Sequence, residues 1–129
     1  MTVLLVEDDT VVRLTLCECL EDAGLEILDA ENAEAALSIL EKSPCRITVL
    51  VTDLHLGPGD NGLVLASKAR RRLPRLRVVY ATGSPEMLRG RRMRPWERLF
   101  IKPFDVCRLR DDVIALERAM CSSMPALHS

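Results

Sequence analysis

The fold of this chain is decided by the stretch Ile47-Thr48-Val49-Leu50-Val51-Thr52-Asp53. A short apolar run bounded by turn residues predicts a strand buried on both faces, as in a parallel sheet. Three other apolar runs also end at polar residues, namely Glu7-Asp8-Asp9, Thr82-Gly83 and Lys102-Pro103. Because the carboxyl ends of parallel strands share one crevice, we expect these residues to gather around Asp53.

Apolar strands alternate with helical patterns along the chain, which predicts βαβ units and an α/β fold. The expected strands cover residues 4–6, 25–28, 47–52, 76–81 and 99–101, and the expected helices cover 10–23, 33–42, 62–72 and 105–120. Right-handed crossovers place helices on both faces of the sheet. We therefore expect a doubly wound, five-stranded parallel sheet in the order 2-1-3-4-5, which sets Glu7 and Asp8 beside Asp53.

A fourth helix, between residues 84 and 95, has weak sequence signals. Ser84-Pro85 is a suitable N-cap and first helical residue, but Gly90 and Pro95 bracket an arginine-rich stretch with few apolar anchors. We expect this helix to be short, mobile or partly unfolded without a bound phosphoryl group.

The size and composition indicate a single domain. The 129 residues predict one domain over residues 1–120, a frayed tail over 121–129 and no output domain. Eighteen basic and 19 acidic residues nearly balance, so the net charge does not indicate binding to nucleic acid or to a membrane surface. The start of the chain lacks the features of a signal peptide. We expect a cytoplasmic protein whose five cysteines are free thiols.

Three carboxylates are predicted to crowd together at the carboxyl edge of the sheet. At that range Glu7, Asp8 and Asp53 would raise one another's pKa unless a cation neutralises them. Mg²⁺ is the usual cation for oxygen ligands that flank a phosphate. The set therefore suits a carboxylate that accepts a phosphoryl group with the help of Mg²⁺.

The other two strand ends supply groups that suit a phosphoryl group. Lys102 offers a compact positive charge, Thr82 a hydroxyl donor, and Gly83 a backbone that a phosphate can approach closely. Each residue alone has a plain structural interpretation as a cap, a turn residue or a solvated surface residue. Their joint occurrence, each at a strand end, favours the phosphoryl site.

The ordered motifs resemble a known family. They are Leu5-Val6-Glu7-Asp8-Asp9, Val51-Thr52-Asp53 with Pro58 and Gly62 downstream, Ala81-Thr82-Gly83, and Lys102-Pro103-Phe104. From residue 3 to about 120, the chain resembles the receiver domain of bacterial two-component response regulators, which has a flavodoxin-like fold. The stretch Tyr80-Ala81-Thr82-Gly83-Ser84 is similar to a subgroup of stand-alone receivers with an aromatic-Ala-Thr-Gly signature.

The resemblance implies that Asp53 is the phosphoacceptor and takes its phosphate from a sensor histidine kinase or a histidine phosphotransfer protein. It implies that Asp8, Asp53 and the main-chain carbonyl of His55 bind Mg²⁺, with Glu7 helping through water. It also implies a cis Lys102-Pro103 bond. His55, and Ser84 two residues after Thr82, occupy the positions that tune the phosphoryl lifetime. Such a protein slowly loses its own phosphoryl group and is not a turnover enzyme.

The chain departs from the family pattern in three places. The loop after Asp53 is one residue longer than usual, and the segment between Thr82 and Lys102 is shortened. Leu99 occupies the position of the switch aromatic that normally moves together with Thr82. Strand alternation points the neighbouring Phe100 to the opposite face. Tyr80 is either a substitute reporter or, as we favour, a core residue.

Arginines are concentrated between residues 70 and 94. Two groups stand out in the sequence: Arg70, Arg71, Arg72 and Arg75, and then Arg89, Arg91, Arg92 and Arg94. A solvated face is favoured over nucleic-acid binding, and partner docking is an intermediate interpretation for the group from Arg89 to Arg94. Trp96 either covers the sheet edge or anchors a partner.

The resemblance predicts a monomeric single-domain response regulator that signals by protein–protein contact in trans, with its downstream target unknown. One alternative is a phosphate sink or relay intermediate. Another is an interaction module that works without phosphate. A phosphatase of the haloacid dehalogenase type would also use an aspartyl nucleophile, but Asp53-Leu54-His55 lacks the second acid of its DxD motif.

Overall fold

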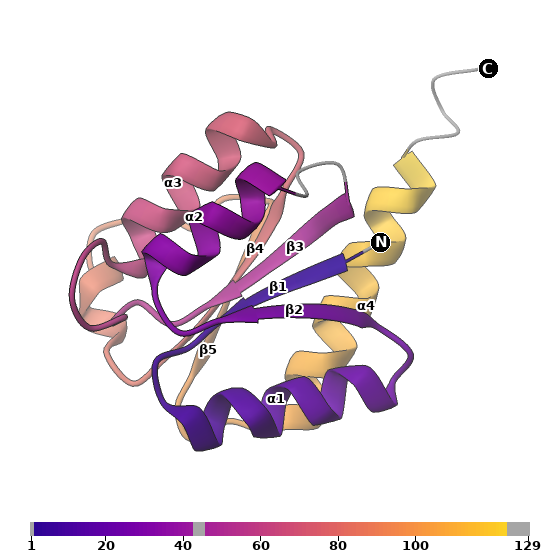
Figure 1. Cartoon of the computed structure of the whole chain (residues 1–129), viewed down its shortest axis with the longest axis horizontal. Helices are drawn as coiled ribbons and strands as arrows, with labels where there is room; N and C mark the ends of the chain where they lie inside the picture. The colour runs from indigo at the N-terminus through magenta and orange to yellow at the C-terminus, as the bar shows by residue number, and fades with distance from the viewer. Residues whose placement is uncertain (1, 43–45, 124–129) are drawn as a thin grey trace.

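The computed structural model describes residues 2–42 and 46–123 and shows one parallel sheet (Figure 1). Its strands are β1 (Thr2–Val6), β2 (Glu26–Ala30), β3 (Ile47–Thr52), β4 (Arg77–Thr82) and β5 (Glu97–Ile101). They lie in the order β2-β1-β3-β4-β5, and every neighbouring pair is parallel. The predicted fold class and strand order are therefore confirmed.

Helices cover both faces of the sheet. They are α1 (Thr10–Asp22), α2 (Ala33–Lys42), α3 (Gly62–Arg72), a 3₁₀ turn η2 (Pro85–Leu88) and α4 (Val106–Ser123). Helices α2 and α3 contact each other on one face, and α1 contacts α4 on the other (Figure 1). Helix α4 continues to Ser123, past its predicted end at residue 120. The rest of the predicted tail, residues 124–129, lies outside the described residues.

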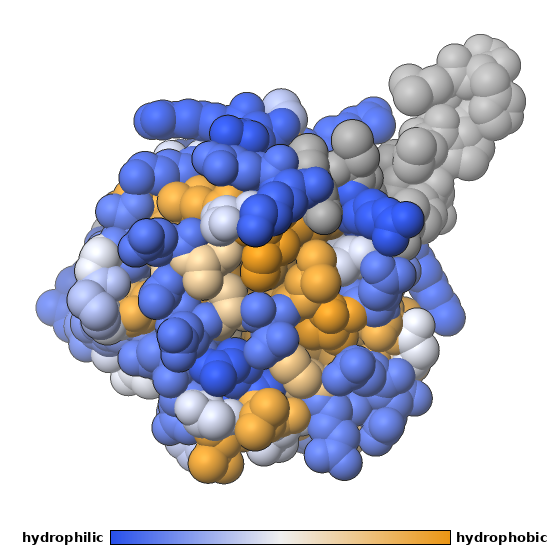
Figure 2. All heavy atoms as spheres, in the orientation of Figure 1, coloured by the Kyte–Doolittle hydropathy of each residue, from blue (hydrophilic) through white to orange (hydrophobic). Residues whose placement is uncertain are grey.

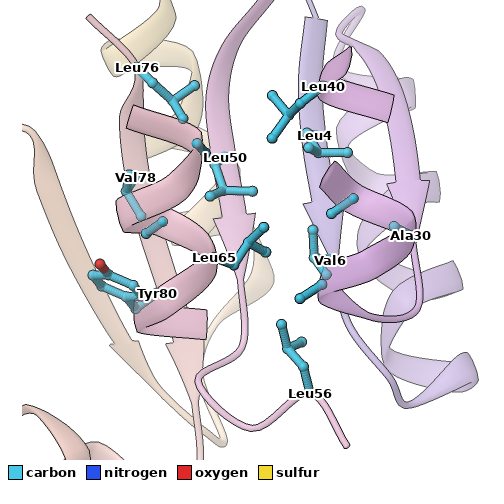
Figure 3. Packing of buried hydrophobic residues seen from close by; sticks show 14 of the residues in the cluster. Leu4, Val6, Ala30, Leu40, Leu50, Leu56, Leu65, Leu76, Val78 and Tyr80 are labelled. Atoms are coloured by element: carbon cyan, nitrogen blue, oxygen red, sulfur yellow. The ribbon is translucent and has the colours of Figure 1, made fainter. Parts of the chain in front are cut away.

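Two apolar cores result from strand alternation. Leu4, Val6 and Leu50 point to the α2–α3 side, where Figure 3 shows them packed with Leu65 and Tyr80. The alternate residues of the same strands, including Val3, Leu5, Val49 and Val51, pack under α1 and α4. Both faces of the central strands are buried, as a continuous apolar run predicts. The strand ends are thereby held at fixed positions along one edge.

Polar caps begin the helices that follow β1, β2 and β3. The Oδ1 atoms of Asp9, Asn32 and Asn61 accept main-chain N–H bonds at 3.1, 2.8 and 2.9 Å from Val12, Ala35 and Val64. Each cap satisfies an N–H group that has no partner within its helix. Capped loops thus connect the strand ends to the helices; those after β1 and β2 are short, whereas the loop after β3 covers residues 53–61.

The predicted fourth helix is reduced to η2. Ser84 precedes η2 but makes no side-chain cap, and the chain runs from Arg91 to Arg94 without regular structure. Helical geometry ends at Arg89, whose ψ is 132°, and Gly90 follows with a positive φ of 77°, a conformation that glycine adopts without strain. The expectation of a short helix is confirmed.

Some apolar residues remain at the surface. Figure 2 shows them between α2 and α1, along the β2 edge of the sheet, and again over α1. Val11 and Leu14 of α1 are 73% and 58% exposed. Among the described residues, no helix combines the length and hydropathy needed to cross a bilayer.

Candidate phosphoacceptor site

The sheet brings three of the predicted residues together by extending its ladder beyond the strands. The N–H of Glu7 donates to the carbonyl of Ala30 at 3.1 Å, and the N–H of Asp53 donates to Val6 at 3.2 Å. The N–H of Lys102 donates to the carbonyl of Thr82 at 2.8 Å. These bonds fix the backbone under each functional side chain, so the site is built on rigid elements.

Three carboxylates form the centre of the site. Glu7 and Asp53 are buried, with 2% and 8% of their surface exposed, whereas Asp8 is exposed. One oxygen from each residue lies within 4.8 Å of the others. Burial raises the pKa of Glu7, and the hydrogen bond from Lys102 opposes this effect without cancelling it. The predicted convergence of the three acids is what the structure shows.

Lys102 is the cation of the site. Its Nζ donates to Glu7 Oε1 at 2.6 Å and to Asp53 Oδ2 at 2.9 Å. Burial lowers the pKa of Lys102, but the bonds to the two carboxylates outweigh burial and the pKa is raised. The Lys102-Pro103 peptide bond is cis. The ammonium group is thus held charged within reach of the expected acceptor.

The charge and chemistry of this donor set fit Mg²⁺. Three ionised carboxylates and one ammonium leave two negative charges, which a divalent cation would neutralise. All the candidate side-chain donors are oxygens, the ligands that Mg²⁺ prefers. The exposure of Asp8 leaves room for the water ligands that Mg²⁺ retains.

Gly62 fixes the position of the Asp53 backbone. Its N–H donates to the carbonyl of Leu54 at 2.8 Å, so α3 begins directly against the residues that follow β3. A Cβ atom at residue 62 would lie 2.1 Å from the main-chain oxygen of Asp53, closer than non-bonded atoms approach. From the sequence, Gly62 was recognised only as part of a motif. The structure gives the reason for a glycine here, which is the close contact with the Asp53 backbone.

The last residue of β4 and the loops after β3 and β4 hold the remaining predicted residues. The N–H of His55 donates to Asp53 Oδ1 at 3.2 Å, and the His55 side chain is exposed. Thr82 is fully buried, and its Oγ1 accepts the N–H of Ser84 at 3.0 Å. Gly83 is exposed, and a Cβ atom there would meet nothing within 4 Å.

Leu99, Phe100 and Tyr80 lie where strand alternation places them. Leu99 packs against the α2–α3 core, whereas Phe100 joins the opposite core and meets the Phe104 ring at 5.9 Å between centroids. Tyr80 is 1% exposed, and its hydroxyl donates to Glu97 Oε2 at 3.0 Å. Tyr80 is therefore a core residue with one buried polar partner.

Arg13 supports the site but was missed from the sequence. Its Nη1 donates to the main-chain carbonyl of Glu7 at 2.8 Å, and its Nε lies 3.2 Å from Asp29 Oδ2. Arg13 thus ties the loop after β1 to the end of β2. No local sequence signal indicates this link, because Arg13 lies on α1 whereas Asp29 lies on β2.

Known proteins with similar sequences identify the family. The family profile of the response regulator receiver domain matches residues 3–114. The chain belongs to this family. Receiver domains act in two-component phosphorelay signalling, and an aspartyl phosphate and Mg²⁺ are typical of them. They are phosphoacceptor modules and typically not turnover enzymes.

Individual relatives and solved structures agree with this assignment. The chain is 36% identical over 81 residues to the alginate biosynthesis transcriptional regulatory protein AlgB of Pseudomonas putida; the match covers 63% of this chain but only 17% of AlgB. A response regulator receiver protein from Sinorhizobium medicae is 26% identical, with a TM-score of 0.84; the match covers 93% of this chain and 96% of the other. The response regulator protein TrrA of Thermotoga maritima, solved in complex with Mg²⁺-BeF, is 26% identical, with a TM-score of 0.76. This match covers 89% of this chain and 97% of TrrA.

Proposed function

We propose that Asp53 accepts a phosphoryl group from a sensor histidine kinase or a histidine phosphotransfer protein in an Mg²⁺-dependent reaction. The observation that carries this proposal is the position of the Asp53 carboxylate between Lys102 Nζ and the acids Glu7 and Asp8. The arrangement provides a nucleophile, one fixed cation and a site for a divalent cation within one crevice.

The transfer forms one covalent bond to the protein, at Asp53, while the other site residues position groups and stabilise charge. An Asp53 carboxylate oxygen attacks the phosphorus of a phosphohistidine, the P–O bond forms, and the P–N bond breaks as the imidazole leaves. Lys102 Nζ, already 2.9 Å from Asp53 Oδ2, balances the charge of the incoming phosphoryl oxygens. Thr82 Oγ1 and the open backbone at Gly83 supply hydrogen-bond donors on the β4 side.

Mg²⁺ would be held by Asp8, Asp53 and the main-chain carbonyl of His55, with Glu7 acting through water. When bound, it neutralises the carboxylates and stabilises the charge of the transferred group. Glu7 is in place for an indirect role, because its Oε1 accepts from Lys102 and its Oε2 accepts from the N–H of Asp9 at 3.2 Å.

We propose roles for the neighbouring loop residues and for the surface as well. The exposed His55 and the half-buried Ser84 flank the site and would control the access of water to the aspartyl phosphate, and so its lifetime. The signal would pass to another protein by surface contact. The segment from Thr82 to Lys102 supports this proposal, because it joins two site residues through η2 and the arginine-rich stretch.

The proposal is tested by incubating the protein with acetyl phosphate and reading its intact mass, with and without Mg²⁺. We expect one added phosphoryl group that is absent without Mg²⁺ and absent in Asp53→Asn. Asp111→Asn removes an exposed carboxylate on α4 and is the matched control, which should be labelled like the wild type. Equal labelling of Asp53→Asn would refute the assignment of Asp53.

A further inference from the structure

A pocket lies between α3, β4 and β5, and none of the predicted phosphoryl-binding or metal-binding residues lines it. Its volume is about 320 Å³. The lining combines the apolar side chains of Leu63, Ala66 and Trp96 with several arginines from α3 and from the segment before β5. The pocket thus has an apolar part and a strongly basic part.

The charges in this pocket do not balance. Four arginines line it, namely Arg70, Arg71, Arg91 and Arg94, together with a single carboxylate, Glu97. That carboxylate is buried and accepts from Arg91 Nη1 and Nη2 at 2.9 and 2.7 Å, as well as from Tyr80 and the N–H of Arg94. Arg70, Arg71 and Arg94 have no acidic partner among the residues that the structure describes. An excess of three positive charges remains.

Two of these guanidinium groups surround Trp96. The Cζ of Arg70 lies 3.8 Å from the ring centroid, and that of Arg94 lies at 5.6 Å. Arg70 is further fixed by donating to the main-chain carbonyls of Leu76 and Pro74. Burial, followed by the positive charge of Arg77, lowers the pKa of Arg70. The pocket therefore holds a fixed Arg70 beside the exposed Arg71 and Arg94, and an anionic group would relieve the repulsion among them.

We infer that this pocket binds an acidic segment of a partner protein. Carboxylates of the segment would pair with Arg71 and Arg94, and an apolar side chain would pack against Leu63 and Trp96. Pairing of unlike charges favours such an encounter, and arginine and tryptophan side chains are typical anchors of protein interfaces. The inference goes beyond phosphoryl acceptance and does not require it.

Nucleic acid fits the pocket less well. Single strands bind by stacking bases on free aromatic faces and by running phosphates along an extended basic groove. One face of Trp96 is covered by the guanidinium of Arg70, and the cavity is compact. A short acidic peptide matches both its size and its mixed apolar and basic lining.

Trp96 is the only tryptophan of the chain, so its fluorescence reports directly on the pocket. We would titrate the full chain with a short synthetic peptide of glutamate and leucine, and with the same peptide carrying glutamine in place of glutamate. The acidic peptide should shift the emission saturably and bind more weakly as salt is added. The glutamine peptide should not bind, and equal binding of both peptides would overturn the inference.

Two double variants test whether the acidic peptide binds in this pocket. The double variant Arg71→Gln with Arg94→Gln should lower the affinity for the acidic peptide by about tenfold or more. Arg108→Gln with Arg118→Gln removes the same charge from exposed positions on α4 and should change affinity by less than about twofold. Equal weakening by both pairs would overturn the inference, as would tighter binding of a DNA oligonucleotide or self-association through this pocket. Both double variants should still be labelled by acetyl phosphate, which separates this result from a failure of the phosphoacceptor.

Discussion

Gly62 lies against the main chain of Asp53, and a methyl group there would have to displace that backbone or the start of α3. We predict that Gly62→Ala lowers the free energy of unfolding by about 1–3 kcal/mol, the usual cost of overpacking. The measurement is urea denaturation followed by circular dichroism.

Gly83→Ala is the matched control for this prediction. A Cβ atom at residue 83 meets nothing within 4 Å, and the structure gives Gly83 no positive φ. We expect this variant to keep the stability of the wild type. Equal stability of the two variants would mean that α3 does not pack against the Asp53 backbone in this way.

Glu97 makes stability depend on pH. Burial alone would raise its pKa, but hydrogen bonds from Arg91, the N–H of Arg94 and Tyr80 outweigh burial and lower it below the ordinary value of 4.5. A carboxyl group whose pKa is lower in the folded state stabilises the protein fully above 4.5 and loses this contribution as pH falls through the folded pKa. The unfolding free energy should therefore decrease as the solution is acidified below 4.5.

Glu97→Gln tests this dependence. The variant should be less stable than the wild type at neutral pH, and its stability should fall less steeply under acid. Glu18→Gln, at an exposed position of α1, should keep the wild-type profile. A wild-type acid profile in Glu97→Gln would show that the network with Arg91 and Tyr80 does not stabilise the folded state.

The contacts of a residue could be predicted from the sequence only where they follow from the strand pattern. Asp53 and Lys102 follow apolar runs, so their meeting is a consequence of the parallel sheet. Glu97 is different, because its burial depends on Arg91 and Tyr80, which no local pattern links to it. The strand β5 begins at Glu97, which pairs with Val78 of β4, rather than at residue 99 as expected.

At the scale of elements, α4 covers one of the two cores. Leu109 is fully buried there, and Leu109→Ala should lower the free energy of unfolding by about 2–5 kcal/mol, the usual range for such a truncation. Leu14→Ala truncates a leucine that is 58% exposed on α1 and should change the free energy by no more than about 0.5 kcal/mol. Similar losses in the two variants, measured by urea denaturation, would contradict the assignment of the core.

The segment from η2 to β5 is the element that we expect to respond to phosphorylation. It has few regular hydrogen bonds and joins Thr82 to the strand that leads to Lys102. Residues 85–93 should exchange their amide hydrogens rapidly in the free protein and more slowly with Mg²⁺ and beryllofluoride. Hydrogen exchange read by mass spectrometry checks this, with α3 as the internal reference. Equal protection of residues 85–93 in both states would rule out this segment as the responding element.

Helix and strand boundaries were predictable where caps and apolar runs coincide. The ranges 33–42, 47–52 and 62–72 match α2, β3 and α3 residue for residue. The edge strand β2 lies one to two residues later than expected, because its mixed burial gives no continuous apolar run. The number of turns in η2 could not be predicted, since weak helix signals do not specify whether a single turn or a full helix forms.

At the scale of the molecule, charge is segregated although the net charge is only −1. The acids Glu7, Asp8 and Asp53 meet at the carboxyl edge of the sheet, and arginines gather beside α3 and β5. Composition alone cannot reveal such a distribution, whereas the strand order predicts its acidic part. The two regions suit different partners, a phosphoryl donor at the first and an acidic segment at the second.

The central claim is that Asp53 carries the phosphoryl group, and localising the group tests it most directly. The protein would be treated with acetyl phosphate and Mg²⁺, reduced with borohydride, which attacks an acyl phosphate but not a phosphate ester, and mapped by peptide mass spectrometry. We predict a reduced residue at position 53 that is absent without Mg²⁺. A phosphoryl group found at another residue, or one that survives borohydride as a phosphate ester, would contradict the account.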